Sequence, residues 1–165
     1  MRSFQLGFTL VELVVTMVVG GIIAAVAMPR FAAKDTFDTR GFYDRATATV
    51  RYAQKLAIAQ RREVFVCVYA PSAPAIGDIS VSYASGCATP ITDVSGVALK
   101  VSAPGGIALS TTTNGIALSP TTNFSFLGGL GETAAEVIIT LTSSVAGDPV
   151  RSIKIENGTG YVHNG

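Results

Sequence analysis

The stretch FTLVELVVTMVVGGIIAAVAM, at residues 8–28, decides how the rest of this chain is interpreted. Apart from threonine and glycine, its only polar side chain is that of Glu12. As an α-helix these 21 residues would extend about 32 Å at ~1.5 Å per residue, which matches the ~30 Å hydrocarbon core of a bilayer. A helix also satisfies its own backbone hydrogen bonds in lipid. The stretch therefore predicts a membrane-spanning helix.

Three interpretations of this apolar stretch compete. A cleaved secretory signal peptide has an apolar region of only about 7–15 residues, and no clear small-x-small cleavage site follows here. An ordinary transmembrane anchor leaves Glu12 unexplained, because a carboxylate in the hydrocarbon region is costly and usually marks a function. The third interpretation is a class III signal peptide, whose apolar segment stays on the mature protein.

The residues Gly7-Phe8-Thr9-Leu10-Val11-Glu12-Leu13 resemble the type IV prepilin motif of bacterial pilins and type II secretion pseudopilins. This resemblance implies a leader peptide at residues 1–7, cleavage between Gly7 and Phe8 by the membrane prepilin peptidase, and N-methylation of Phe8. It also implies that Glu12 pairs with the α-amino group of Phe8 on a neighbouring subunit of a filament. A buried carboxylate needs such a partner, and the pair would set the axial register.

Two residues are candidates for a kink or hinge after the apolar segment at residues 8–29. Pro29 removes a backbone donor and clashes with the preceding turn, so we expect it to kink or open the helix locally. The alternative is that Pro29 ends the helix at the membrane edge. Gly41 is a second weak point. The pilin resemblance implies that the stem loosens between such positions during assembly.

From Phe42 onward, apolar residues recur with the spacing of a helix, and the basic residues lie largely off their stripe. We therefore predict an amphipathic helix over residues 30–62 that packs this stripe against a β-sheet. The helix is expected to end near Arg61–Arg62, because Glu63 begins a β-rich run. The stripe consists of Phe42, Ala46, Val50, Ala53 and Ala57.

Residues 63–165 are predicted to form a β-rich head. Turns are expected at Asp148-Pro149 and Asn157-Gly158, and residues 101–131, which lack charged side chains, are expected to form short strands and ordered loops. A helix followed by strands predicts an α+β fold in which the helix packs on an antiparallel β-sheet, and the pilin resemblance implies the same. The expected strands are Val64–Ala70, Ile79–Ala84, Val97–Val101, Ile116–Leu118, Asn123–Leu127, Val137–Thr142, Val150–Glu156 and Tyr161–His163.

Charge is sparse and unevenly distributed. Charged residues make up 14% of the 165 residues, against about 25% in a typical soluble domain. The formal net charge of +1 excludes a grossly basic nucleic-acid binder. Residues 30–62 hold eight Lys/Arg and three Asp, net +5, whereas residues 63–165 hold three Lys/Arg and seven Asp/Glu, net −4. These charges either attract neighbouring subunits or belong to a solvated helix face.

The two cysteines and the one histidine do not form a metal or catalytic motif. If the head lies outside the cytoplasm, Cys67 and Cys87 are expected to form a disulfide, and two free thiols are the alternative. One histidine and two separated cysteines lack tetrahedral ligand spacing. His163 is expected to be frayed and exposed. Since no nucleotide, hydrolase or metalloprotease motif is present, we predict no enzymatic activity, no metal and no cofactor.

Later segments resemble more specifically the GspH/FimT family of minor pseudopilins and minor pilins, and residues 29–62 also resemble minor pilins of mannose-sensitive haemagglutinin-type pili. The resemblance implies a single-pass protein of the bacterial inner membrane, with its head in the periplasm, that joins a pilus or pseudopilus. The implied partners are the prepilin peptidase, the major and other minor (pseudo)pilins, and the inner-membrane assembly platform. The segments are RYAQKLAIAQRREV (51–64), FSFLGGLG (124–131), VIITLT (137–142) and VRSIKIENGTGYV (150–162).

DNA binding during natural transformation is the alternative function, because FimT-like members of that family bind DNA. Their basic C-terminal Gly-Arg-x-Arg-type motif corresponds here to Gly160-Tyr161-Val162-His163, which lacks both arginines. Phosphate binding needs a basic surface, whereas this head is net acidic. Arg151 and Lys154 are the two residues that would still contribute, so nucleic acid is the less favoured partner.

Overall fold

The structure of the chain is a computed structural model that describes residues 9–70, 77–93, 95–118 and 121–165, without the side chains of residues 26–36 and 121. Within these residues one helix, α1 (Leu10–Gln60), precedes all the strands. The chain divides into two compact units, with the boundary between Asp35 and Thr36. This boundary falls inside α1, and each unit is described by itself.

In the first unit, α1 begins at Leu10 and continues through Pro29. The alternative in which Pro29 ends the helix is therefore wrong, while the kink stays a prediction. The described side chains from Leu10 to Ala25 are all exposed, although most are apolar. Within the described residues, no helix combines the length and the hydropathy that a membrane crossing needs. The span predicted at residues 8–29 begins one residue before them and includes residues 26–29, whose side chains are not described.

In the second unit, the amphipathic half of α1 packs as predicted. All five residues of the predicted apolar stripe, from Phe42 to Ala57, are fully buried. They lie against side chains from the strands in one hydrophobic core. The helix ends at Gln60, because the next residue, Arg61, has a φ of 50°, which leaves the helical region.

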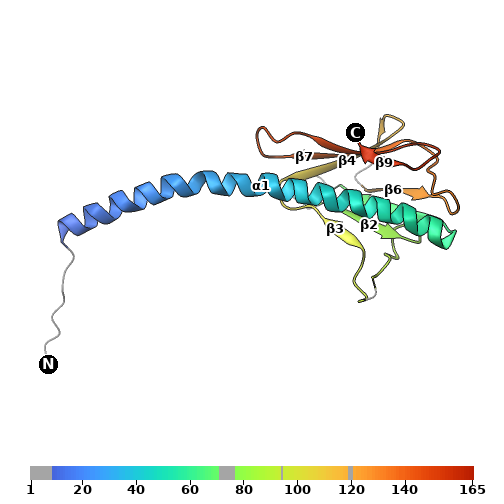
Figure 1. Ribbon diagram of the computed structural model, residues 1–165, viewed down its shortest axis with the longest axis horizontal. Coiled ribbons are helices and arrows are strands. Elements are labelled where there is room, and N and C mark those ends of the chain that lie inside the picture. The colour runs from blue at the N-terminus through green and yellow to red at the C-terminus, as the bar shows by residue number, and fades with distance from the viewer. Residues whose placement is uncertain (1–8, 71–76, 94, 119–120) are drawn as a thin grey trace, which may run out of the picture. The chain divides into compact units, whose positions relative to one another are not determined.

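Two antiparallel sheets, rather than the single one predicted, form the β-rich head (Figure 1). The four-stranded sheet has the order β3-β2-β1-β6, and the five-stranded sheet has the order β5-β4-β7-β8-β9. Every pair of neighbouring strands is antiparallel. The strands are β1 (Val64–Tyr69), β2 (Asp78–Ser82), β3 (Lys100–Ser102), β4 (Ile107–Thr113), β5 (Ile116–Ala117), β6 (Thr121–Phe126), β7 (Val137–Ser143), β8 (Arg151–Ile155) and β9 (Val162–Asn164).

The eight predicted strands all have counterparts, and one observed strand was not predicted. β4 lies inside the uncharged stretch, where its Ser and Thr residues hide the pattern of a strand. Its burial nevertheless alternates, with Ile107, Leu109 and Thr111 pointing inward, and it pairs with β7 along its whole length. The predicted turn at Asn157-Gly158 is confirmed between β8 and β9, whereas the turn between β7 and β8 lies at residues 146–147, just before the predicted Asp148-Pro149.

The core of the second unit is shared by α1 and both sheets. Figure 1 shows the part of α1 from residue 36 onward running across the strands. Phe42 from the helix, Val66 and Phe126 from the four-stranded sheet, and Ile139 and Ile153 from the five-stranded sheet belong to the same buried cluster. Each side chain of this size stabilises the fold by about 1.5–3 kcal/mol when buried. The helix and both sheets therefore share one hydrophobic core.

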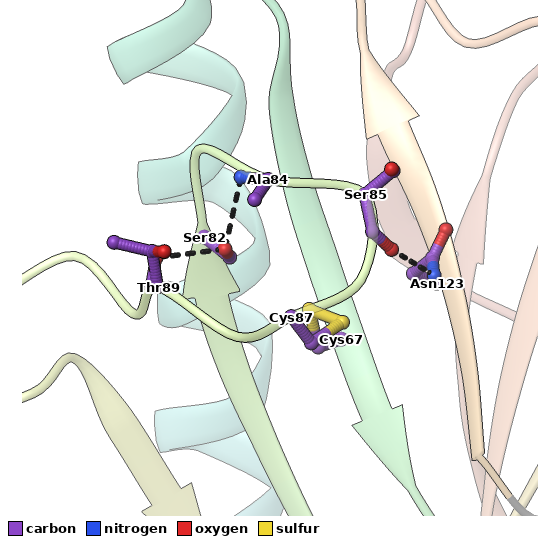
Figure 2. The surroundings of a disulfide bond; sticks show 7 residues. All are labelled: Cys67, Ser82, Ala84, Ser85, Cys87, Thr89 and Asn123. Carbon is purple, nitrogen blue, oxygen red and sulfur yellow. Dashed lines mark hydrogen bonds between the residues drawn. A yellow bond between two sulfur atoms is a disulfide. The ribbon is translucent and has the colours of Figure 1, made fainter.

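A disulfide joins Cys67 of β1 to Cys87 in the loop after β2, as predicted (Figure 2). The Cα atoms are 6.0 Å apart, and no described cysteine is free. Around it, Ser82 Oγ donates to the carbonyl of Thr89 at 2.8 Å and accepts from the backbone N–H of Ala84 at 3.0 Å. The Asn123 side chain on β6 donates to the carbonyl of Ser85. The loop is thus fastened to three strands of one sheet.

Candidate assembly site

The predicted processing residues, Gly7 and Phe8, lie outside the described residues. The structure begins to describe the motif at Thr9, whose side-chain oxygen accepts a hydrogen bond from the backbone N–H of Glu12 at 3.3 Å. The carbonyl of Thr9 accepts the first bond of the helix, from Leu13 N–H at 3.2 Å. Thr9 is therefore the N-cap of α1.

This cap was overlooked in the sequence, although a signal for it is present. Thr9-x-x-Glu12 has the spacing of a capping box, in which a Thr at the N-cap is followed three residues later by Glu. The structure shows one half of that arrangement, the bond to the Thr9 side chain. The motif thus specifies the first turn of the helix as well as the predicted processing site.

Glu12 lies in the first turn of α1 and is exposed. The unpaired N–H groups at a helix N-terminus give that end a partial positive charge, which favours a carboxylate there. Glu12 has no ion pair within the described residues, and its neighbours Val11 and Leu13 are exposed apolar side chains. Its pairing with the amino group of Phe8 on a neighbouring subunit stays a prediction.

Gly41, the second candidate hinge, lies within the continuous part of α1. Its carbonyl oxygen accepts a hydrogen bond from Arg45 Nε at 3.1 Å, and the space where a Cβ would stand is open. The structure therefore gives no packing reason for a glycine at this position. A hinge at Gly41 or Pro29 remains a prediction.

Gln54 of α1 is the point where two distant loops meet, and the sequence did not single it out. Its side-chain Nε2 lies 3.2 Å from the carbonyl oxygen of Gly131 and 3.2 Å from that of Thr159. A Cβ on Gly160 would lie 2.0 Å from the Gly131 oxygen. The glycines of the FSFLGGLG and ENGTGYV segments therefore allow two backbones to approach each other beneath one helix side chain.

The outer edge of β9 is held by two more side chains of α1. Arg51 donates to the carbonyl of Val162 at 3.3 and 3.1 Å. The Tyr43 hydroxyl lies 2.7 Å from Asn164 Oδ1 and 3.2 Å from the Ser152 carbonyl. The bond from Arg51 uses a backbone acceptor of this edge strand that a further strand would otherwise occupy, whereas Tyr43 contacts the Asn164 side chain and a carbonyl of β8.

The two candidate DNA contacts are both occupied by ion pairs within the chain. Arg151 lies 3.0 Å from Asp148, and Lys154 lies 3.0 Å from Glu136 and 3.1 Å from Glu156. Hydrogen bonds to Glu136, and then to Glu156, raise the pKa of Lys154. Their positive charges are thus already balanced by carboxylates.

The sequence analysis predicted that His163 is frayed and exposed, and this prediction is wrong. It lies on β9, is partly buried, and its Nε2 is 2.9 Å from Glu156 Oε1. Its ring stacks on that of Tyr161, with the centroids 5.4 Å apart. In the part of the chain that the structure describes, no group of three His, Cys, Asp or Glu side chains is arranged to hold a metal ion.

Parts of this sequence resemble known proteins. Residues 2–28 match the prokaryotic N-terminal methylation motif. A stretch of 61 residues is 36% identical to the type IV narrow pilus major component PilA5 of Thermus thermophilus, which covers 37% of this chain and 53% of that protein. The chain thus matches about half the length of that relative.

Solved structures resemble the fold across most of the chain. Two crystal forms of the Pseudomonas aeruginosa type IV minor pilin FimU align with TM-scores of 0.51 and 0.52 at 13% and 14% identity. Each covers 76% of this chain, and 87% and 91% of FimU, respectively. The long helix packed on antiparallel sheets is therefore a pilin-like α+β fold. The chain therefore combines a methylation motif at its N-terminus with a type IV pilin-like fold.

Proposed function

We propose that this chain is a minor pilin or pseudopilin, a subunit that starts or joins a type IV pilus or a type II secretion pseudopilus. The observation that carries the proposal is the combination of the methylation motif at residues 2–28 with a pilin-like fold in the remainder. The minor role is supported by the likeness to FimU over most of both chains, whereas the likeness to the major component PilA5 is confined to 61 residues. The GspH/FimT family is the finer assignment that we favour.

Processing at Gly7 and Phe8 fits the start of the helix. Cleavage after Gly7 leaves a new amino group on Phe8, immediately before the N-cap Thr9. The carboxylate of Glu12 is exposed within the first turn and is available to a partner outside its own helix. The methylated amino group of Phe8 on a neighbouring subunit carries the opposite charge. In the proposed filament it would lie beside the Glu12 carboxylate.

The membrane is the proposed first environment of the helix, and a filament is the second. The described side chains from Leu10 to Ala25 are apolar almost throughout and exposed on every side of α1. Burying such a surface stabilises a protein by about 25 cal/mol for each Å² removed from water. Lipid in the inner membrane, and then the stems of other pilins in the filament, provide that burial. The head then lies in the periplasm, where the disulfide is stable.

The test compares Glu12→Val with Glu132→Val in a bacterium that carries the corresponding assembly machinery and lacks its own copy of the protein. We expect both variants to be cleaved to chains that begin at methylated Phe8, as read by mass spectrometry of the N-terminal peptide. Glu12→Val is expected to be lost from sheared filaments by at least about tenfold, because it lacks the charge partner. Glu132→Val, which removes a partly buried carboxylate of the head that has no ion pair among the described residues, should enter filaments normally.

Two results would contradict the proposal. Absence of cleavage at Gly7 would remove the prepilin assignment, and normal incorporation of Glu12→Val would remove the assembly role of the carboxylate. The ratio of this chain to other pilins in the filament, measured by quantitative mass spectrometry, decides between a minor and a major subunit. DNA binding is not favoured by the ion pairs of Arg151 and Lys154, and a gel shift with duplex DNA checks it.

A further inference from the structure

A hollow of about 520 Å³ lies on the exposed side of α1, next to Asn164 of β9. Ala48 lines it and is exposed, and its side chain ends at Cβ. Asp44 stands one helical turn before Ala48, while Arg51 and Tyr52 stand one turn after it, so that longer side chains surround a short one. The volume falls within the range of about 300–1,000 Å³ that is usual for small-molecule sites.

One end of this hollow carries two cations, Arg51 and Lys55. They are one helical turn apart on an exposed face, where like charges repel each other. Neither has an ion pair within the described residues. The three Lys/Arg of residues 63–165, by contrast, all have carboxylate partners. An anion between Arg51 and Lys55 would relieve their repulsion, and the folded chain supplies none.

The guanidinium group of Arg51 is already held in place. Its Nε and Nη2 donate to the carbonyl of Val162 at 3.3 and 3.1 Å. The other N–H groups of this planar fork have no partner among the described residues, and their geometry suits a carboxylate. Because the side chain is fixed before a ligand arrives, little of its conformational freedom is lost on binding.

The rest of the hollow suits hydroxyl groups rather than further negative charge. Asp44 has no ion pair within the described residues and offers carboxylate oxygens as acceptors. The Asn164 side-chain oxygen is 2.7 Å from the Tyr43 hydroxyl, which leaves its NH₂ group as a donor. A chain of phosphates along this side of α1 would meet the negative charge of Asp44. The lining therefore favours a ligand with one carboxylate and several hydroxyls.

Tyr52 adds an apolar surface to this polar lining. Its side chain is 47% exposed, and it lines the hollow beside the two cations. The face of an aromatic ring is negative, so it attracts the polarised C–H groups on one face of a sugar ring. A flat organic acid without such a face would gain less from this contact.

We propose that this hollow binds an acidic sugar, with the sugar carboxylate on Arg51 and Lys55, its hydroxyls on Asp44 and Asn164, and its ring face on Tyr52. A second hollow of about 340 Å³ shares Asp44 and Asn164 with the first and gives room for a further sugar unit. The same chemistry is offered by a free hexuronate and by a uronate at the end of a glycan. The site is independent of the proposed filament role, and binding is measured on the chain alone.

The experiment titrates the full chain in detergent micelles with D-glucuronate and follows the backbone amide signals by NMR. We expect the Ala48 and Tyr52 amides to shift and to saturate. D-glucose lacks the carboxylate and acetate lacks the sugar ring, so each should bind at least about tenfold more weakly, the loss of one hydrogen bond to a charged group or its equivalent. A disaccharide that ends in glucuronate distinguishes the two sources. Tighter binding than the monosaccharide indicates a glycan end, and weaker binding indicates the free sugar.

Two pairs of variants make the test specific. Ala48→Leu fills the hollow without changing its charge and should weaken glucuronate binding at least about tenfold, whereas Ala59→Leu, at an exposed position of the same helix, should not. Lys55→Gln should weaken it about tenfold, and Lys100→Gln in the four-stranded sheet should leave it unchanged.

Three results would overturn the proposal. The first is no saturable shift with glucuronate, which requires no variant to fold. The second is acetate or D-glucose binding as tightly as glucuronate, because the hollow would then recognise only half of the proposed ligand. The third is equal affinity in Ala48→Leu and Ala59→Leu, which would place the bound sugar elsewhere on the chain.

Discussion

The two halves of α1 place their apolar side chains in opposite environments. Between residues 10 and 25 apolar side chains cover every side of the helix, and all of them are exposed, Leu10 by 78% and Ile23 by 64%. Between residues 42 and 57 five of them form one stripe, and every member of that stripe is fully buried. A stripe on one face is satisfied by the chain's own sheets. A helix that is apolar all round needs lipid or other chains, so the first half is specified for partners and the second for folding.

The largest effect is expected at Phe42, and Phe37 provides its control on the same helix. Phe42 is fully buried, whereas Phe37 is 73% exposed. Phe42→Ala should lower the free energy of unfolding by about 3–5 kcal/mol, through lost burial and the cavity left behind. Phe37→Ala should change it by less than about 0.5 kcal/mol. Urea unfolding followed by the tyrosine signal of the head measures both. Equal losses would show that the stripe does not define the folding half of α1.

The next effect is expected in the strands, where the Cys67–Cys87 bridge constrains the head. The bridge closes a loop with a sequence separation of 20, for which the chain-entropy estimate gives about 3 kcal/mol. The double variant Cys67→Ser/Cys87→Ser should lose about that much stability in urea. Adding a reductant to the wild type should give a similar loss, and adding it to the double variant should have no effect. A double variant as stable as the oxidised wild type would contradict this prediction.

Local patterns in the sequence predicted the helix and most of the strands, whereas contacts between distant segments could not be predicted from it. The helical stripe from Phe42 to Ala57 was correct because it reflects one period within one element. β4 was missed because its outward positions carry Ser and Thr, which are as common in loops. The division into two sheets was missed because strand pairing depends on which segments meet in space.

In the candidate site, too, local features could be predicted from the sequence and long-range contacts could not. The methylation motif was recognised because its residues are contiguous, and the cap of Thr9 was readable from its spacing to Glu12. Gln54 could not be found, because its partners at Gly131 and Thr159 are 77 and 105 residues away in sequence. His163 was misjudged because its position near the end of the sequence does not show that β9 pairs with β8.

A smaller effect is expected at Gln54, where the folding half of α1 makes a polar rather than an apolar contact. Gln54→Leu removes the donor to two loop carbonyls and should cost about 1 kcal/mol of unfolding free energy, as partly buried acceptors lose a partner. Gln60→Leu is the control, because Gln60 is exposed at the end of the same helix. Urea unfolding measures the difference between the two variants. A loss no larger for Gln54→Leu than for Gln60→Leu would mean that the glycines alone hold the two loops together.

The smallest effect is expected from the surface charges of the head, on the pH dependence of thermal stability. The lowered pKa of Glu156 sets the direction of this dependence. Hydrogen bonds from His163, and then from Lys154, lower the pKa of Glu156 in the folded chain. A lowered carboxyl pKa adds stability above its unfolded value, and this stability is lost as the pH falls through the folded value. The thermal midpoint of the wild type should therefore fall between about pH 6 and about pH 3. In Glu156→Gln this fall, the gap between the two midpoints, should be smaller. Glu132→Gln, for which the structure shows no ion pair among the described residues, should leave that gap unchanged. An equal gap in wild type and Glu156→Gln would show that solvent screens the cluster completely, and the stability of the head would then rest on its apolar contacts with α1.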